Sequence, residues 1–395
     1  MTAIPLSLTG LRTGTSGLER AAWALLVAAV AAVQLSTSIS QGLLVAAFLA
    51  WGGMLARRTI RFEAPPYFVP MLVYVGFTLL SCVFSIDPAR SLDRARQLSW
   101  FLAVPVVYSL ARGPRAARMM TVILSVGALS ATFGIVQFAV LHYDSLGQRP
   151  VGTLSHWMTY SGQLMLVLCA VAGRLIFADK GRLWPALVAP ALLVALELTL
   201  TRSAWVGVSV AVGMLLMMRD LRLAAGLPVV GALMFALAPD TVASRMLSTF
   251  DMQDATNRDR VAMSRAGLAI IAEHPLTGAG PNMIPTVYPK YRTADAVRMN
   301  TPHLHNNLVQ IAAERGLPAL AAWLWFIGAL VLHLARLLRS GSRVLAATGI
   351  ACVGAMLTAG LFEYNFGDSE FLMLFLVMVT LPAAERQEAP ADVDA

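Results

Sequence analysis

The sequence predicts an all-α, polytopic integral membrane protein, and three observations lead to this fold class. First, 57% of the 395 residues are hydrophobic and only 13% are charged, which is more apolar surface than one soluble core can bury. Second, about twelve apolar runs are long enough to cross a bilayer, which takes roughly 17–25 helical residues. Third, an open strand would leave peptide groups unpaired in lipid, so each crossing is expected to be a helix.

The expected crossings follow one another closely, with one exception. They span 18–36, 40–56, 67–85, 96–111, 117–141, 157–178, 183–200, 203–219, 221–238, 317–338, 343–361 and 367–384. The chain is thereby divided into a membrane domain of about nine crossings (1–238), an outer loop with short interfacial helices (239–316), and about three crossings with a cytoplasmic tail (317–395). Chemistry that faces water is expected in the middle part.

The distribution of Lys and Arg among the short loops predicts the orientation of the chain. With the N-terminus inside, seventeen basic residues fall on inner segments: Arg12, Arg20, Arg57, Arg58, Arg61, Arg112, Arg115, Arg118, Arg174, Lys180, Arg182, Arg219, Arg222, Arg336, Arg339, Arg343 and Arg386. Five fall on short outer loops: Arg90, Arg94, Arg96, Arg149 and Arg202. Both termini are therefore expected in the cytoplasm. The net charge of +8 reflects this bias beside anionic membrane lipids, so no nucleic-acid partner is expected.

Candidate metal ligands are few in the sequence. Cys82, Cys169 and Cys352 fall within expected crossings, where they are interpreted as small packing residues rather than a disulfide or a metal-ligand pair. Asp251 and Asp254 are interpreted as solvated loop residues. Because no convincing ligand cluster is found, neither a metal nor a cofactor is expected.

The long outer segment contains one expected helix and one expected turn. AMSRAGLAIIAEHPL predicts a helix, because Ala262, Ala266, Ala269 and Ile270 recur at helical spacing and Pro275 ends the pattern. LTGAGPNMIP follows as a Gly and Pro cluster. Its glycines resemble a phosphate loop only faintly, since neither a Lys-Ser/Thr pair nor a preceding strand accompanies them, and a plain turn is expected.

The segment after Pro302 predicts a short amphipathic helix. Asn306 or Asn307 can cap its start and Gly316 can end it. Polar residues fall near one face, which is expected to line a wet cavity: His303, Asn307, Gln310 and Glu314. One histidine at a helix start is more often there to satisfy orphan backbone groups. The whole polar set, which also includes His305, favours a functional site at the outer membrane surface.

Arg202 stands between two apolar runs in LELTLTRSAWVGVSV. A charged residue at membrane depth is costly and is a functional hypothesis by default. The alternative is topological, with Arg202 in a tight outer turn between two crossings and its side chain extended to the lipid headgroups. Position alone leaves both interpretations open.

Three stretches together resemble the O-antigen ligase and polymerase superfamily of bacterial surface polysaccharide assembly. They are TRSAW at 201–205, the arginine-rich approach to a helix that ends in HPLTGAGPN at 274–282, and HLHNNLVQIAAERGLPA at 303–319. His305, Asn306 and Gly316 match the family pattern of His-Asn, nine residues and Gly, and Arg202 matches the arginine that follows Ser or Thr. Departures at Ala319 and Ser264, where a second glycine and an aromatic residue are common, concern the subgroup.

The resemblance implies an O-antigen ligase that transfers a glycan from an undecaprenyl diphosphate donor to lipid A-core, at the periplasmic face of the bacterial inner membrane. Guanidinium groups suit a diphosphate because they form paired hydrogen bonds and stay charged. A neutral histidine suits removal of the acceptor proton, and no metal is needed. The expected roles are: at the donor diphosphate, Arg202, Arg265 and Arg260; as the base, His305 or His303; in support, Asn306, Asn307 and Gln310.

Other functions stay open on sequence grounds. An O-antigen polymerase or a protein O-oligosaccharyltransferase would use similar donor chemistry on another acceptor. A polytopic lipid or glycan transporter or flippase is the alternative from a different class, because polar residues near broken helices also mark transport sites at the bilayer midplane. The expected cluster lies at the outer surface, which favours an enzyme.

Overall fold

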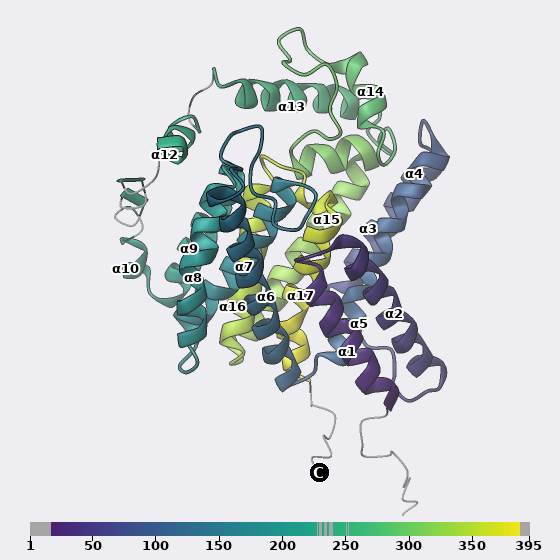
Figure 1. Cartoon of the computed structure of the whole chain (residues 1–395). Helices are drawn as coiled ribbons and strands as arrows, with labels where there is room; N and C mark the ends of the chain where they lie inside the picture. The colour runs from purple at the N-terminus through teal and green to yellow at the C-terminus, as the bar shows by residue number, and fades with distance from the viewer. Residues whose placement is uncertain are drawn as a thin grey trace, which may run out of the picture.

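The computed structural model describes residues 17–387, except 227, 229, 230, 233, 234, 237–239, 250 and 252. Every regular element in this part of the chain is a helix, which confirms the expected all-α class. Figure 1 shows the longer helices standing side by side as a bundle, with α13 and α14 lying across one of its ends. The beginning of α1 and the end of α17 lie at the other end.

The first half of the chain forms most of the bundle. Its elements are α1 (Gly17–Ala32), α2 (Thr37–Ala56), α3 (Phe68–Val83), α4 (Pro88–Ala95), the 3-10 helix η1 (Arg96–Leu102), α5 (Ala103–Leu110), α6 (Pro114–Ala139), α7 (Trp157–Phe177), α8 (Leu183–Leu198) and α9 (Arg202–Arg219). Of these, α4 was not expected, because PARSLDRA is too polar to span lipid. The expected crossing at 96–111 is formed by η1 and α5 together.

The second half adds the end layer and the last long helices. Its elements are α10 (Leu221–Ala224), α12 (Asp240–Leu247), α13 (Ala255–Glu273), α14 (Ile284–Tyr291), α15 (Asn307–Arg339), α16 (Arg343–Ala359), the 3-10 turn η2 (Asn365–Gly367) and α17 (Ser369–Glu385). The expected crossing at 221–238 begins with α10, and its remainder lies largely outside the described residues. The helix expected in AMSRAGLAIIAEHPL, from Ala262 to the stop at Pro275, is confirmed by α13, which begins earlier at Ala255 and ends at Glu273.

Four described helices are long and apolar enough to cross a membrane: α2, α6, α7 and α15. Three further apolar helices, α3, α8 and α16, have 16 or 17 residues, which gives roughly 24–26 Å at about 1.5 Å per residue. A hydrocarbon core is roughly 30 Å thick, so these helices are slightly short by length alone. The helices indicate a multi-pass membrane protein, while the number of about twelve crossings stays a prediction.

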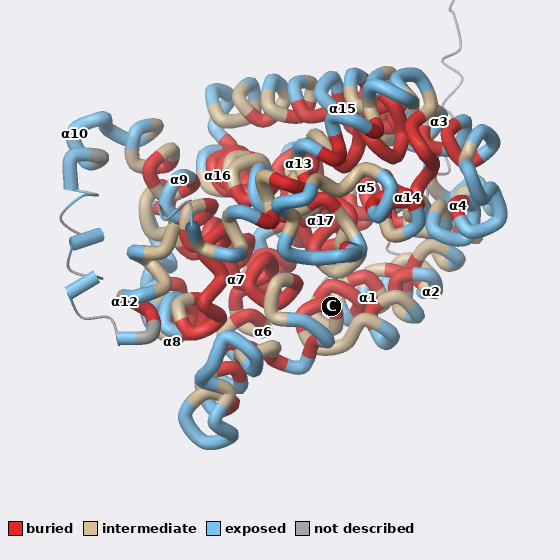
Figure 2. The backbone as a smooth tube through the Cα atoms, turned by 90° about the horizontal axis from the view of Figure 1, so that it is seen from above, coloured by how far each residue is buried: buried red, intermediate tan, exposed pale blue. Residues whose placement is uncertain are grey.

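The core of the bundle is formed by α7, α16 and α17. A helix that is apolar all round is buried on all sides, and every residue from Phe371 to Ala384 in α17 is buried. Figure 2 shows these helices red in the middle of the bundle, whereas α10 is exposed at its edge. Polar groups in this core have partners: the Tyr67 hydroxyl donates to Thr380 Oγ1 at 3.1 Å, and Gln163 Nε2 donates to the Val33 carbonyl at 2.8 Å.

α15 is interrupted at Gly316, where φ is 82° and ψ is 167°. A Cβ at this position would lie 2.1 Å from the Leu276 carbonyl oxygen, so both the backbone angle and the close approach require glycine. The expected helix end at Gly316 is thus confirmed. Asn306 caps the start of the same helix, since its Oδ1 accepts from the Val309 amide at 3.0 Å.

The turn after α13 packs against this interruption. The Gly278 amide donates to the His274 carbonyl at 3.0 Å, and the Gly280 amide donates to the Glu314 carbonyl at 2.9 Å. Because these amides bind backbone carbonyls, they are not directed at a ligand, and the expectation of a plain turn is confirmed. The turn thereby fixes the end layer onto α15.

Candidate active site

A cavity of about 170 Å³ lies between α13, the start of α9 and the loop before α7. We call it the arginine cavity, because five arginines line it: Arg149, Arg202, Arg245, Arg260 and Arg298. Its wall also contains Asp259 and three histidines, His156, His303 and His305. Asp259 is an ion-pair partner of Arg298, at 3.2 Å from the arginine Nε. The cavity therefore has an excess of positive charge, as an anion-binding site requires.

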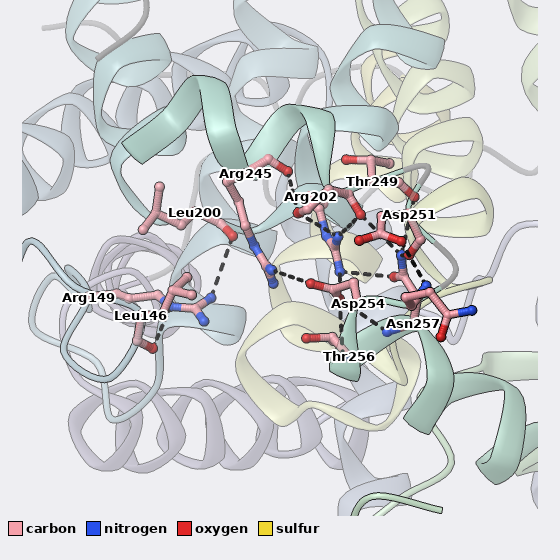
Figure 3. Close-up of polar contacts among 12 residues, drawn as sticks. Leu146, Arg149, Leu200, Arg202, Arg245, Thr249, Asp251, Asp254, Thr256 and Asn257 are labelled. Carbon is pink, nitrogen blue, oxygen red and sulfur yellow. Dashed lines mark hydrogen bonds and ion pairs between the residues drawn. The ribbon is translucent and has the colours of Figure 1, made fainter. Parts of the chain in front are cut away.

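Arg202 is the first residue of α9 and follows the tight turn that the sequence predicted. Its side chain is only 4% exposed and is directed into protein, so it does not extend to lipid headgroups. Its Nη1 donates to the Ser248 carbonyl at 2.6 Å, and its Nη2 donates to Asp254 at 3.0 Å and to Asn257 Oδ1 at 2.9 Å. Figure 3 shows these bonds joining α9 to the segment before α13.

Asp254 is a structural partner of two arginines rather than a solvated loop residue. Its carboxylate caps α13 by accepting from the Thr256 and Asn257 amides, and it pairs with Arg202 at 3.0 Å and Arg245 at 3.5 Å. Burial alone would raise the pKa of Asp254, but the hydrogen bond and charge of Arg202 outweigh it and lower the pKa. The sequence-based interpretation of Asp254 is wrong, because its cationic partners are distant in sequence. Asp251 is exposed, as expected.

Arg260 and Arg265 lie on the same helix but face different surroundings. Arg260 lines the arginine cavity, and its buried Nε has no hydrogen-bond partner. In the described part of the chain, its guanidinium forms no ion pair within 4.0 Å; burial, followed by the charges of Arg202 and Arg245, lowers its pKa against the opposing charge of Glu363. Arg265 is 59% exposed and pairs with Asp295 at 3.0 Å. The structure thus brings Arg202 and Arg260 together, and it does not bring Arg265 to this cavity.

Glu363 joins the two histidines of the HLH motif. His305 Nδ1 lies 2.9 Å from Glu363 Oε2, and His303 Nε2 lies 3.6 Å from Glu363 Oε1. The two imidazole centroids are 4.2 Å apart. His305 has a φ of 49°, a backbone region that costs free energy for a residue other than glycine. This local strain is consistent with a ring orientation that the surrounding contacts impose.

The charges of Glu363, His303 and His305, which we call the trio, determine which imidazole nitrogen can accept a proton. Burial raises the pKa of Glu363, but the charges of His305 and His303 outweigh it, so the pKa lies well below its ordinary value. An ionised carboxylate only accepts hydrogen bonds, so His305 Nδ1 donates and, in the neutral ring, Nε2 keeps its lone pair. Burial lowers the pKa of His303 to about 4, against the opposing effect of Glu363. At neutral pH, Glu363 is therefore ionised and His303 is neutral.

Residues 187–324 match a family model described as O-antigen ligase. This segment is therefore similar to the O-antigen ligase family. The matched O-antigen ligase domain includes Arg202, Arg260, His303 and His305, whereas Glu363 and Arg149 lie outside it. A comparison with curated proteins finds no match. The match supports a function of the ligase or polymerase type in broad terms.

The expected supporting residues of the O-antigen ligase domain fix the trio in place. Asn307 Nδ2 donates to Asn365 Oδ1 at 2.7 Å, and the Asn306 amide side chain donates to the Leu361 carbonyl at 3.0 Å. Both bonds reach the segment that carries Glu363. Gln310 Oε1 accepts from the Leu304 amide at 2.7 Å, between the two histidines. These residues are therefore placed to position the site, and any direct role stays a prediction.

The polar face expected on the helix after Pro302 does not line water. Asn307, Gln310 and Glu314 are each at most 2% exposed, because the segment after α16 and the turn after α13 cover this face. Glu314 pairs with Arg315 at 3.0 Å. The expectation of a wet face is wrong for these three residues, whereas His303 lines the arginine cavity.

The ligand atoms of His303, His305 and Glu363 all lie within 4.8 Å of one another. Two imidazoles and a carboxylate are a ligand set that suits Zn²⁺. The statement that the chain offers no convincing ligand cluster is therefore wrong, because Glu363 stands 58 residues after His305. Metal-independent transfer stays a prediction, with a test in the Discussion.

Sequence reasoning missed several residues of the candidate site. They are Glu363, His156, Arg149, Arg245 and Arg298. One signal pointed to Glu363: FEYNFGDSE at 362–370 places three carboxylates and an amide between two apolar runs. The same cost of charge near a crossing that singled out Arg202 applies to this stretch. The arginines gave no comparable signal, because exposed loops are rich in arginine.

Proposed function

We propose that the chain is an O-antigen ligase that transfers a glycan from undecaprenyl diphosphate to a hydroxyl of lipid A-core, at the periplasmic face of the bacterial inner membrane, in lipopolysaccharide assembly. The observation that carries the proposal is the junction of the arginine cavity with the hydrogen-bonded His305–Glu363 pair. Cations for a diphosphate leaving group and a base for a hydroxyl border the same space.

The arginine cavity supports binding of the donor diphosphate. Arg260 is the leading contact, because its buried Nε has no hydrogen-bond partner among the described residues and its guanidinium can form paired hydrogen bonds to phosphate oxygens. Arg202 is a positioning residue in this proposal, since its terminal nitrogens already bind Ser248, Asp254 and Asn257. Preorganised cations of this kind stabilise the charge that develops on the leaving group.

The His305–Glu363 pair supports general-base catalysis. The acceptor hydroxyl oxygen attacks the anomeric carbon of the donor sugar and forms the new glycosidic bond. The bond from that carbon to the phosphate oxygen breaks, and its electron pair leaves with the diphosphate. His305 Nε2 takes the hydroxyl proton. Glu363, at 2.9 Å from His305 Nδ1, stabilises the imidazolium that forms.

Glu363 also offsets the unfavourable effect of the helix dipole on a protonated base at the start of α15. The positive end of the α15 dipole disfavours an imidazolium near Asn307, and a hydrogen-bonded carboxylate opposes that effect. His303 is the weaker candidate, because burial lowers its pKa to about 4 and a base of low pKa has little affinity for the proton. We therefore assign the base to His305 and a positioning role to His303.

Reconstitution in liposomes with purified lipid-linked glycan tests this function. Lipid A-core, a second lipid-linked glycan and a Ser/Thr peptide serve as competing acceptors, and products are identified by mass. We expect lipid A-core extended by the glycan, with release of undecaprenyl diphosphate. A longer lipid-linked glycan would identify a polymerase, and a glycosylated peptide would identify a protein O-oligosaccharyltransferase. Movement of donor across the bilayer without any covalent product would identify a transporter and contradict the proposal.

A further inference from the structure

A second cavity, of about 310 Å³, lies on the other side of His303. His156, Met158, Pro302 and His303 line both this cavity and the arginine cavity, so the two share one wall. Glu363 lines the second cavity while its partner His305 lines the first. The hydrogen bond between them therefore runs from one space to the other.

The two cavities differ in charge. The second cavity is lined by two carboxylates, Glu363 and Asp368, and by a single arginine, Arg94. Arg94 Nη2 donates to the Gly367 carbonyl at 2.8 Å, so this nitrogen is already bound to the wall of the cavity. We call this space the carboxylate cavity. It is less suited to a diphosphate than the arginine cavity, because the ionised Glu363 repels an anion.

Asp368 is held in place and keeps hydrogen-bonding capacity. Its Oδ1 caps α17 by accepting from the Phe371 amide at 3.0 Å, and its Oδ2 accepts from the Thr159 hydroxyl. Glu370 is a third hydrogen-bond partner, and burial together with the charge of Glu370 raises the pKa of Asp368 to about 7. A carboxyl group offers about four hydrogen-bonding sites, so about one stays available for a ligand. The Thr159 oxygen, which donates to Asp368, can itself still accept. Carboxylate and hydroxyl oxygens in this arrangement match the neighbouring hydroxyl groups of a sugar ring.

We propose that the carboxylate cavity binds an uncharged sugar ring of the acceptor, with Asp368 and Thr159 holding its non-reacting hydroxyls. This inference rests on the proposed function and adds where the acceptor binds and what it is. The aromatic rings of Tyr364 and Phe371 also line the cavity and suit the apolar faces of a sugar. From this position, the reacting hydroxyl passes His303 to meet His305 in the arginine cavity.

The size and charge of the cavity favour a neutral sugar over other acceptors. Its volume is at the lower end of the roughly 300–1,000 Å³ of small-molecule pockets, which suits one ring better than an oligosaccharide. A phosphorylated sugar would meet the negative charge of Glu363. A peptide serine would leave most of the carboxylate lone pairs unused.

Two variants separate the binding role of the cavity from folding. Asp368→Asn keeps the helix cap, because Asn is as good an N-cap as Asp, but it removes the charge. Thr159→Val keeps the side-chain shape and removes the hydroxyl. Thr132→Val is the matched control, since Thr132 is exposed on α6 and bonds only the Ala128 carbonyl of its own helix.

The probes are methyl glucoside and methyl glucoside 6-phosphate, measured against the full chain in nanodiscs. We expect wild type to prefer the neutral glycoside, and each cavity variant to raise its KM roughly tenfold, the effect of losing a charge-assisted hydrogen bond. The KM for the lipid-linked donor stays at the wild-type value in both variants, and Thr132→Val changes neither KM. Two results overturn the proposal while the protein still catalyses transfer. One is an unchanged KM for the acceptor in both cavity variants, and the other is a preference of wild type for the phosphorylated glycoside.

Equilibrium binding distinguishes this failure from failure of the proposed function. Methyl glucoside binding is measured by saturation-transfer NMR, without donor. If wild type catalyses no transfer at all, the proposed function fails; glycoside binding that weakens in Asp368→Asn and Thr159→Val still supports the sugar site. Binding that is equal in wild type and both variants contradicts it. A peptide that competes better than the glycoside also overturns it.

Discussion

Two groups of arginines in this protein have opposite surroundings. On the loops expected to face the cytoplasm, Arg57, Arg58, Arg61, Arg219 and Arg222 are exposed, and their number fits an attraction to lipid headgroups. Around the arginine cavity, five arginines converge on one space beside three histidines. The residue type is the same, so counting basic residues predicts orientation but does not find the site. Burial and convergence identify the arginines that are placed for chemistry.

The same contrast appears within α13. Arg260 and Arg265 are five positions apart, which turns their side chains by roughly 140° at about 100° per residue. Arg260 is at the cavity without an ion-pair partner among the described residues, whereas Arg265 is exposed and bound to Asp295. A single helix thus offers both a test residue and its control.

The largest expected effect comes from the base. His305→Ala should lower the rate of transfer by about 10²- to 10⁴-fold, the usual contribution of general-base catalysis, because no other neutral imidazole is oriented by a 2.9 Å bond to Glu363. Donor binding should survive. The measurement is single-turnover transfer with donor bound in advance.

His303→Ala is the comparison variant for this measurement. We expect it to lose less activity than His305→Ala, since it positions the trio without taking the proton. An inactive His303→Ala beside a nearly normal His305→Ala would move the base role to His303. Normal rates in both variants would eliminate histidine base catalysis at this site.

A smaller effect concerns stability at low pH. The pKa of His303 is lowered to about 4 in the fold, whereas a histidine in the unfolded chain has a pKa of about 6.5. Between these values the unfolded chain binds the proton more readily, so stability is fully present above about pH 6.5 and is lost as pH falls toward 4. The slope is at most on the order of 1 kcal/mol per pH unit.

His303→Asn removes this titration and should flatten the dependence. The apparent Tm in detergent, measured from pH 7.5 to pH 4.5 in small steps, should fall less steeply in the variant than in wild type. His274→Asn is the control, because His274 follows α13 outside both cavities. Equal slopes for wild type and His303→Asn would contradict the assignment of a neutral, buried ring.

The smallest expected effect is that of a chelator, for which we predict no change in the rate of transfer. The five arginines supply positive charge that a divalent ion supplies elsewhere. The test is stringent here, because His303, His305 and Glu363 lie within ligand distance of one another. Transfer is followed after dialysis against EDTA and after return of Mg²⁺, Mn²⁺ or Zn²⁺. Activity that is lost with EDTA and restored by one of these ions would refute metal independence.

Local sequence patterns predicted the elements of the fold and part of the site. Long apolar runs, the helical spacing in α13, and the stop at Gly316 depend on neighbouring residues, so they are readable along the chain. The His-Asn pattern correctly marked a helix start, with Asn306 as its cap. These features need no knowledge of how helices pack.

Pairings between distant segments could not be predicted in this way. Glu363 meets His305 only because α16 returns the chain to the start of α15, and Asp254 meets Arg202 only because α13 begins beside α9. Whether Arg260 or Arg265 reaches the cavity depends on the rotation of α13 about its own axis. The spacing of Ala262, Ala266 and Ile270 identifies the packed face of this helix, but it does not tell which of the two arginines faces the cavity. Tertiary packing therefore decides which of several plausible arginines reaches the cavity.

Equilibrium binding of undecaprenyl diphosphate to wild type, Arg260→Lys and Arg265→Lys tests the arginine cavity most directly. Lysine keeps the charge and loses the two-pronged guanidinium geometry, so the variants should still insert and accumulate. We predict that Arg260→Lys raises the Kd by roughly 10-fold or more, from the roughly 1.5–3 kcal/mol of a charged hydrogen bond, and that Arg265→Lys binds as wild type does. Equal affinities for all three proteins, or a larger loss in Arg265→Lys, would contradict donor binding in this cavity.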